Sequence, residues 1–155
     1  MLRVDWADLL LVAPLSAHTL AKISHGFCDD TLSCVIRAWD FGHGPRPGKP
    51  LFLAPAMNTA MWDHPLTQAQ LSAVKGFSNT TGRDAGPGSK DNHDTNACTN
   101  RNCVRIISPQ VKTLACGEVG NGALASVDEI LQTVSDVLSE EVNSENFTSI
   151  QSSTR

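Results

Sequence analysis

Three short apolar runs are spread along the chain, and each is followed within two residues by a proline. They occupy residues 8–12, 49–54 and 103–107. Strands that are buried on both faces of a parallel sheet have this form, because neither face needs alternating polar positions. The runs therefore predict three strands of a parallel sheet.

Between and after these runs, apolar residues recur at the three- and four-residue intervals of one helix face. The predicted helices are residues 19–27, 31–39, 66–75 and 127–138. Gly76 stands where a C-terminal cap of the third helix is expected. Ser126 and Glu129 have the spacing of a capping box before the fourth. Alternating strands and helices predict a layered α/β domain with right-handed crossovers.

The remaining segments set the expected limits of the domain. Residues 77–102 are polar and without periodicity, which is typical of an insertion loop. Residues 140–155 are rich in Ser, Glu and Asn, which favours a disordered tail, so the domain is predicted to span residues 1–139. Three strands make a small sheet and no Gly-rich turn follows the first run, so we expect the domain's first strand or strands to be missing.

Composition and charge narrow the classes of function. The net charge is −4, so no strongly basic surface draws the chain to nucleic acid or to an anionic membrane. Tyr is absent and aromatic residues make up 5%, which argues against a stacking platform for single-stranded nucleic acid. No apolar run approaches the roughly 20 residues of a membrane span, and no leader follows Met1, so a cytoplasmic location is predicted.

The most specific stretch is residues 55–62, which read Pro-Ala-Met-Asn-Thr-Ala-Met-Trp directly after the second predicted strand. In open α/β sheets, ligands bind at the carboxyl ends of the strands. A small Ala56 permits close approach to a ligand, and the Asn58 amide can both donate and accept hydrogen bonds. The alternative is purely structural: a strand exit at which Asn58 caps a following helix.

Residues 55–62 match the PxMNxxMW motif of the flavoprotein decarboxylases that act on cysteine. Residues 6–20 resemble the second flavin-contacting strand and loop of that family, and residues 28–40 resemble the helix that comes next. Residues 114–117 and 121–123 resemble its substrate-recognition flap. With these motifs in the family's order, the chain resembles the phosphopantothenoylcysteine decarboxylases, which implies a flavodoxin-like or Rossmann-like domain.

The resemblance implies FMN as the cofactor and the small molecule 4′-phospho-N-pantothenoylcysteine as the substrate, in coenzyme A synthesis. Asn58 would bind the cysteine carboxylate of that substrate, and Cys116 would be the acid that returns a proton. The implied flavin contacts are Ser16, Ala17, His18, Thr19, Ala56 and Met57. The implied lining of the flap over the substrate is Leu114, Ala115 and Gly117.

The implied chemistry explains these residue types. Loss of CO₂ from an ordinary carboxylate leaves a carbanion that cannot delocalise, so in the family FMN first oxidises the CH₂–S unit of the substrate. The Asn58 amide can hold a carboxylate without fixing its charge as strongly as a cation would. A thiol with an ordinary pKa of about 8.5 is mostly protonated at neutral pH, so Cys116 can donate a proton.

One family feature is missing from the sequence. The family's catalytic histidine and its phosphate-binding Gly-Ser loop precede the segment that begins at Trp6, and no histidine precedes Trp6 here. The family forms trimers with the active site at the subunit boundary, so a homotrimer or a mixed trimer is implied. Two other hypotheses stay open: a catalytically incomplete or phosphatase-regulating subunit, and a peptide-cysteine decarboxylase.

Other cysteines and histidines have simpler interpretations. Cys28 and Cys34 lie in a helical stretch, where buried small side chains are expected more often than a redox pair. His93, Cys98 and Cys103 lack the spacing of a zinc site, so no metal is predicted. The chain has five cysteines, an odd number, and no visible secretion signal, so reduced thiols are expected.

Overall fold

A computed structural model describes residues 6–42, 48–78, 104–113 and 119–152, with side chains described up to Ser139 except at Thr113 and Val119. Its centre is a parallel sheet of order β1-β2-β3, built from Leu10–Leu15, Leu51–Pro55 and Val104–Ile106. This sheet confirms the prediction from the three apolar runs. An antiparallel hairpin of β4 (Gln110–Thr113) and β5 (Val119–Ala123) was not predicted, because neither strand carries a continuous apolar run.

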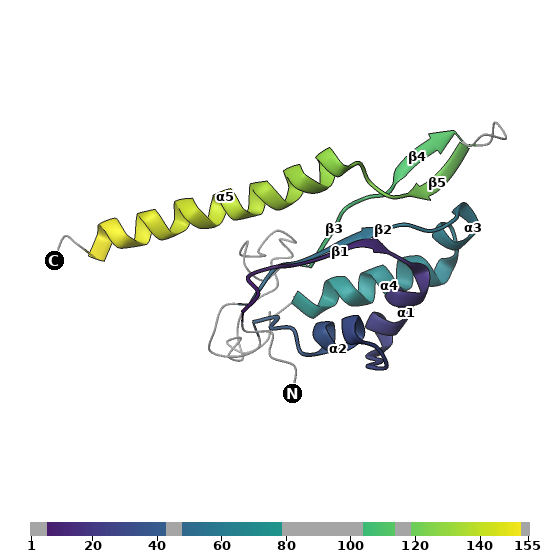
Figure 1. The fold of residues 1–155 in the computed structure, drawn as a ribbon, viewed down its shortest axis with the longest axis horizontal. Helices are drawn as coiled ribbons and strands as arrows, with labels where there is room; N and C mark the ends of the chain where they lie inside the picture. The colour runs from purple at the N-terminus through teal and green to yellow at the C-terminus, as the bar shows by residue number, and fades with distance from the viewer. Residues whose placement is uncertain (1–5, 43–47, 79–103, 114–118, 153–155) are drawn as a thin grey trace, which may run out of the picture.

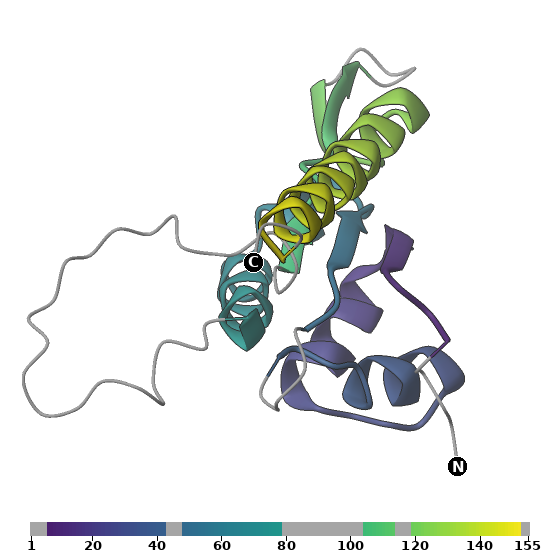
Figure 2. The ribbon, with the colours of Figure 1, turned by 90° about the vertical axis from the view of Figure 1, so that its left-hand side faces the viewer.

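Helices cover both faces of the sheet. On one face lie α1 (Ala17–His25), α2 (Thr31–Arg37) and α4 (Pro65–Lys75), and α5 (Val127–Ser152) crosses the other (Figure 1). A one-turn helix, α3 (Thr59–Trp62), follows β2, and a 3-10 turn, η1 (Gly76–Ser78), follows α4. Figure 2 shows the same layers from another side, with α5 apart from α1 and α2. The predicted layered α/β architecture is therefore confirmed.

The central strand β2 explains why one sheet has two cores. All of its residues are buried, since β1 and β3 flank it and helices lie on both faces. Alternate side chains of a strand point to opposite faces. Leu51 and Leu53 pack with α1, α2 and α4, while Phe52 and Ala54 pack with α5. A strand that is apolar at every position is thus required here.

The helix starts agree with the expected caps. The backbone N–H of Glu129 donates to Ser126 Oγ at 3.1 Å, as the spacing of these residues predicts. Helix α1 begins at Ala17, earlier than predicted, because Ser16 caps it and accepts a hydrogen bond from the Thr19 N–H at 3.1 Å. Gly76 caps α4 in a right-handed conformation with φ of −64°. Glycine's access to positive φ is therefore not used at Gly76.

The far end of α5 differs from the prediction. The helix continues to Ser152, so its predicted end at residue 138 is wrong, and residues 140–152 are helical instead of disordered. Residues 139–152 contain neither Gly nor Pro, so the sequence holds no strong signal that would stop the helix. A polar composition favoured disorder but does not prevent a helix from continuing once it has begun. The domain boundary at residue 139 stays a prediction.

Candidate functional site

Three segments that are distant in the sequence meet at the carboxyl edge of the sheet. Strand β1 leads into α1, β2 leads into residues 56–58, and β5 contacts α3 (Figure 1). Two backbone hydrogen bonds connect them. The Ala56 N–H donates to the Leu15 carbonyl at 2.9 Å, and the Met57 N–H donates to the Gly122 carbonyl at 2.9 Å. The segment after β2 is therefore fixed from both sides by main-chain groups.

Gly122 is the point of closest approach between the hairpin and this segment. Its φ of +101° lies in the region that favours glycine. A Cβ atom there would lie 2.5 Å from the Met57 carbonyl oxygen and 3.2 Å from the Trp62 Cβ. Sequence reasoning placed Gly122 in the flap by resemblance only. The sequence could have indicated this contact through the glycine itself, because a glycine in a short segment with few apolar residues often marks a close backbone approach.

Asn58 fulfils the structural alternative and still has capacity for a ligand. It is the N-cap of α3, and its Oδ1 accepts a hydrogen bond from the Met61 N–H at 2.8 Å. The side chain is exposed. Within the part of the chain that the structure describes, its Nδ2 donates to no other group. The cap thus orients the amide so that both Nδ2 hydrogens can reach a bound acceptor.

Thr67 stabilises α3 through a hydrogen bond and was not predicted as part of the site. Its hydroxyl donates to the Met61 carbonyl, and its side chain is buried in the first turn of α4. His64 caps that helix, with Nδ1 accepting from the Leu66 N–H at 3.2 Å. Thr67 gave no signal in the sequence, because a threonine near the start of a helix is common and its partner lies in another element.

The loop between β1 and α1 brings two hydroxyls to the same edge. Ser16 Oγ and Thr19 Oγ1 lie 3.0 Å apart at the start of a nine-residue helix. Ala17 is half-buried, and His18 is exposed on the first turn. The free N–H groups of a helix start attract anionic or carbonyl groups of a ligand. The structure therefore places Ser16, Ala17, His18 and Thr19 on the same edge as Ala56, Met57 and Asn58.

Several predicted residues lie outside the described part of the chain. Cys116, with its neighbours Leu114, Ala115 and Gly117, is one such group, and His93, Cys98 and Cys103 are another. Among the described residues, no group of three or more His, Cys, Asp or Glu side chains could hold a metal ion. No helix in that same part is long and apolar enough to cross a lipid bilayer.

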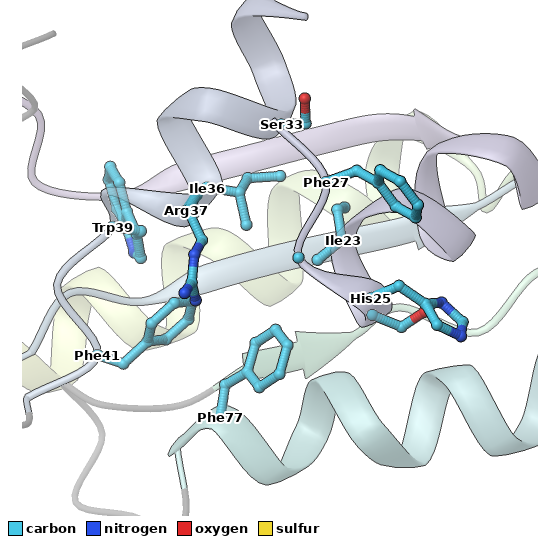
Figure 3. Close-up of a pocket in the computed structure, with 11 residues that line it drawn as sticks. Ile23, His25, Phe27, Ser33, Ile36, Arg37, Trp39, Phe41 and Phe77 are labelled. Atoms are coloured by element: carbon cyan, nitrogen blue, oxygen red, sulfur yellow. The ribbon is translucent and has the colours of Figure 1, made fainter. Parts of the chain in front are cut away.

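A cleft of about 500 Å³ lies in the helix layer on one face of the sheet, between the end of α1, α2 and η1, and no predicted site residue lines it. Phe41 and Phe77 meet there edge to face, with ring centroids 5.5 Å apart (Figure 3). Beside the cleft, Lys22 Nζ lies 2.7 Å from Asp29 and 2.8 Å from Asp30. Hydrogen bonds from Lys22 and then Ser33 lower the pKa of Asp30 to about 2. The resolved charge interactions thus lie away from the predicted site.

A parallel sheet that gathers a helix start, an oriented amide and a glycine-dependent hairpin at its carboxyl edge defines a ligand-binding α/β domain. The Flavoprotein family matches residues 3–139, and the chain belongs to that family. The predicted membership of the flavin-dependent cysteine decarboxylases agrees with this match.

The similar proteins carry the names that the motifs led us to expect. The phosphopantothenoylcysteine decarboxylase of Mus musculus is 43% identical over 143 residues, which are 90% of this chain and 55% of that protein. One from Arabidopsis thaliana is 42% identical over 129 residues, 83% of this chain and 47% of that protein. The chain thus spans about half the length of these relatives.

Solved structures agree with the sequence relatives. A PPC decarboxylase mutant complexed with pantothenoylaminoethenethiol has a TM-score of 0.60 and 40% identity, covering 83% of this chain and 54% of that one. The FMN binding protein AtHal3 has a TM-score of 0.58 and 41% identity, covering 83% and 53%. The peptidyl-cysteine decarboxylase EpiD, at 22% identity and a TM-score of 0.52, covers 81% and 55% and shares the fold. The flavodoxin-like α/β fold is therefore established.

Proposed function

We propose that this chain forms the flavin and substrate site of an FMN-dependent phosphopantothenoylcysteine decarboxylase. The enzyme would convert 4′-phospho-N-pantothenoylcysteine to 4′-phosphopantetheine and CO₂, in coenzyme A synthesis. The observation that carries this proposal is the meeting of the α1 start, the Asn58 amide and Gly122 at one edge of the sheet. The names of the relatives at about 40% identity support the same reaction.

The residues at this edge fit a flavin. Ser16 and Thr19 offer hydroxyls beside the free N–H groups of α1, which suit polar groups of the cofactor. Ala17 and Ala56 are small, so a flat ring can approach the main chain closely. We assign Met57 and His18 as further contacts. FMN, when bound, supplies the electron sink that decarboxylation of an unactivated carboxylate requires.

Asn58 is the proposed substrate-orienting residue. Its Nδ2 would donate to the cysteine carboxylate, while its Oδ1 stays on the Met61 N–H. A neutral amide gives the carboxylate a direction without a full opposite charge, so release of CO₂ is not opposed by an ion pair. Cys116 is proposed as the proton donor, and Leu114, Ala115 and Gly117 are proposed to cover the substrate.

The substitution Asn58→Asp tests this role. A carboxylate oxygen can still accept from Met61, so the cap of α3 is kept, but the Nδ2 donor is lost and a negative charge faces the substrate. We expect kcat/KM to fall roughly 100-fold or more, with flavin binding retained. The measurements are CO₂ release by the purified chain with added substrate, and visible absorbance of bound FMN.

Asn58→Ala is the matched control, because it removes the cap and the donor together. We expect it to lose both stability and activity, whereas Asn58→Asp should lose activity alone. Equal kcat/KM values for the wild-type chain and Asn58→Asp would overturn the assignment of the carboxylate contact. Failure of the wild-type chain to take up FMN would overturn the flavin site itself.

A second candidate is a flavin-binding subunit without its own lyase activity. Relatives named HAL3 and the structure described as the FMN binding protein AtHal3 favour this alternative. A yellow chain that releases no CO₂ alone, but does so after mixing with an active relative, would identify such a subunit. Light scattering of the same samples would test whether the chain forms the proposed homotrimer or mixed trimer.

A further inference from the structure

The turn between α1 and α2 holds two cysteines at close range. Cys28 is exposed, and Cys34 is half-buried in the first turn of α2. The Cys34 Sγ lies 3.3 Å from the Cys28 carbonyl oxygen, and the Cys28 Sγ lies 3.6 Å from the Gly26 carbonyl oxygen. The sequence interpretation of two buried small side chains is therefore wrong, most clearly for Cys28.

We propose that Cys28 and Cys34 are a reactive dithiol, which low-molecular-weight disulfides such as oxidised glutathione convert to an intramolecular disulfide. The thiolate of Cys28 attacks one sulfur of the reagent, forms a mixed disulfide and releases one thiolate. The thiolate of Cys34 then attacks the Cys28 Sγ and releases the second. Two protein thiols are oxidised, the reagent is reduced to two thiols, and the two protons pass to those thiols.

The surroundings give the two cysteines different roles. The exposed Cys28 is the site that an external reagent reaches first. Burial, followed by the charges of the neighbouring Cys28 and Asp30, raises the pKa of the Cys34 thiol. Cys34 therefore stays protonated and reacts less readily with external reagents. Once Cys28 is in a mixed disulfide its thiolate charge is gone. One of the causes that keep Cys34 protonated is then removed, which favours the second attack.

The backbone between the two cysteines is already ordered. The Ser33 N–H donates to Asp30 Oδ1 at 2.8 Å, and the Asp30 N–H donates to Ser33 Oγ at 3.2 Å. This reciprocal cap fixes the turn that separates the thiols, so little additional ordering is needed to bring them together. On the other side, Gly26 ends α1 with φ of +75°.

The dithiol is independent of the proposed flavin site. It lies at the carboxyl-terminal end of α1, whereas Ser16 and Thr19 lie at the start, and nine residues of helix span about 13 Å. It also lies next to the cleft of Figure 3, whose lining includes Gly26, Phe27 and Ser33. A disulfide between Cys28 and Cys34 would therefore fix the turn at the rim of that cleft.

Trypsin isolates the pair in a single peptide. Residues 23–37 follow Lys22, end at Arg37 and contain both cysteines without an internal Lys or Arg. Cys98, Cys103 and Cys116 fall in three other tryptic peptides. An internal disulfide therefore lowers the mass of peptide 23–37 by two hydrogens, about 2 Da, while any other pairing joins two peptides.

The experiment equilibrates the folded full chain with graded ratios of oxidised to reduced glutathione, then quenches with acid and alkylates free thiols. We expect half-oxidation of peptide 23–37 at a ratio roughly tenfold lower than the same peptide requires when free in solution, because the fold raises the effective concentration of the thiols. Equal or poorer oxidation in the folded chain would overturn the proposal, as would a lasting glutathione adduct on Cys28.

Two variants test the order of attack. Cys34→Ser should stop at the glutathione adduct on Cys28. In the Cys28→Ser chain, the Cys34 thiol should react at least about tenfold more slowly than Cys28 does in the wild-type chain. Cys98→Ser is the control and should oxidise at the pair like the wild type. Rapid modification of Cys34 in the Cys28→Ser chain would contradict the assigned roles. If either variant does not fold, the comparison of the wild-type chain with the free peptide 23–37 still tests the proposal.

Discussion

Main-chain hydrogen bonds connect segments at both edges of the parallel sheet, but side chains contribute differently to the two edges. At the carboxyl edge, main-chain groups make the connections: Ala56 to Leu15 and Met57 to Gly122. At the amino edge, the Lys49 N–H donates to the Asp40 carbonyl at 2.8 Å, and a side chain adds a hydrogen bond of 3.0 Å from Trp39 Nε1 to the Lys49 carbonyl. Main-chain connections leave side chains available for a ligand.

Polar side chains also differ between the carboxyl edge and the turn that joins α1 to α2. At the carboxyl edge, the Asn58 Oδ1 accepts the hydrogen bond that caps α3, and its Nδ2 can donate to a ligand. In the turn between α1 and α2, Lys22 is bound to both Asp29 and Asp30, and Asp30 also caps α2. The polar side chains of this turn bind one another, whereas the Asn58 amide keeps a donor for a ligand.

The largest expected effect comes from adding a methyl group at the main-chain contact of the carboxyl edge. We expect Gly122→Ala to reduce the free energy of unfolding by about 3 kcal/mol, because the alanine would keep a positive φ and its Cβ would lie 2.5 Å from the Met57 carbonyl oxygen. Urea denaturation measures this loss, and FMN titration should show weaker binding.

Two glycines that end helices away from the hairpin, Gly26 after α1 and Gly76 after α4, serve as controls for that prediction. Gly26 has a positive φ of 75° but nothing within 4 Å, so Gly26→Ala should cost about 1 kcal/mol. Gly76 has nothing within 4 Å and no positive φ, so Gly76→Ala should change stability by at most about 0.5 kcal/mol. An order other than this one would show that the hairpin contact is not tight.

A smaller effect is expected from the cap of α1. Ser16→Ala removes the acceptor of the Thr19 N–H and should lower the free energy of unfolding by about 1 kcal/mol. Ser126→Ala removes the same kind of bond at the start of α5, from the Glu129 N–H, and should cost a similar amount. Only Ser16→Ala should also weaken FMN binding, which titration by absorbance can measure. Equal FMN affinities of Ser16→Ala and Ser126→Ala would contradict the proposed contact between Ser16 and the flavin.

The smallest effect is a pH dependence that arises at the turn between α1 and α2. The pKa of Asp30 is lowered from 3.8 to about 2 by Lys22 and then Ser33, so its ionised form stabilises the fold at pH values above 3.8. That stability is lost as the pH falls through about 2. Compared with the wild type, Asp30→Asn should have a lower urea midpoint at neutral pH, and the difference should disappear only below pH 2.

Asp29→Asn is the matched variant for this pH dependence. It removes one contact to Lys22 and leaves the hydrogen bonds between Asp30 and Ser33 intact. Its urea midpoint should therefore fall less than that of Asp30→Asn at neutral pH. A larger fall for Asp29→Asn would show that the main stabilising charge is on Asp29, which contradicts the prediction.

The sequence predicted the elements whose residues act through local pattern. Strand β2 is apolar throughout because it is buried on both faces, and Ser126 caps α5 because its partner lies three residues away. Gly122 and Thr67 could not be found in this way, since their partners lie in elements that are distant in the sequence. Cys28 was misjudged because helical spacing does not reveal which residues of a turn face solvent.

The hydrogen bond between Met57 and Gly122 has a mechanical consequence. Because the Gly122 carbonyl is the acceptor of the Met57 N–H, β5 cannot move away from α3 without removing that acceptor. Displacement of the hairpin therefore also loosens the turn that carries Asn58. A small molecule that displaces the hairpin as it enters would disturb the orientation of the Asn58 amide, and re-forming the bond between Met57 and Gly122 would restore it.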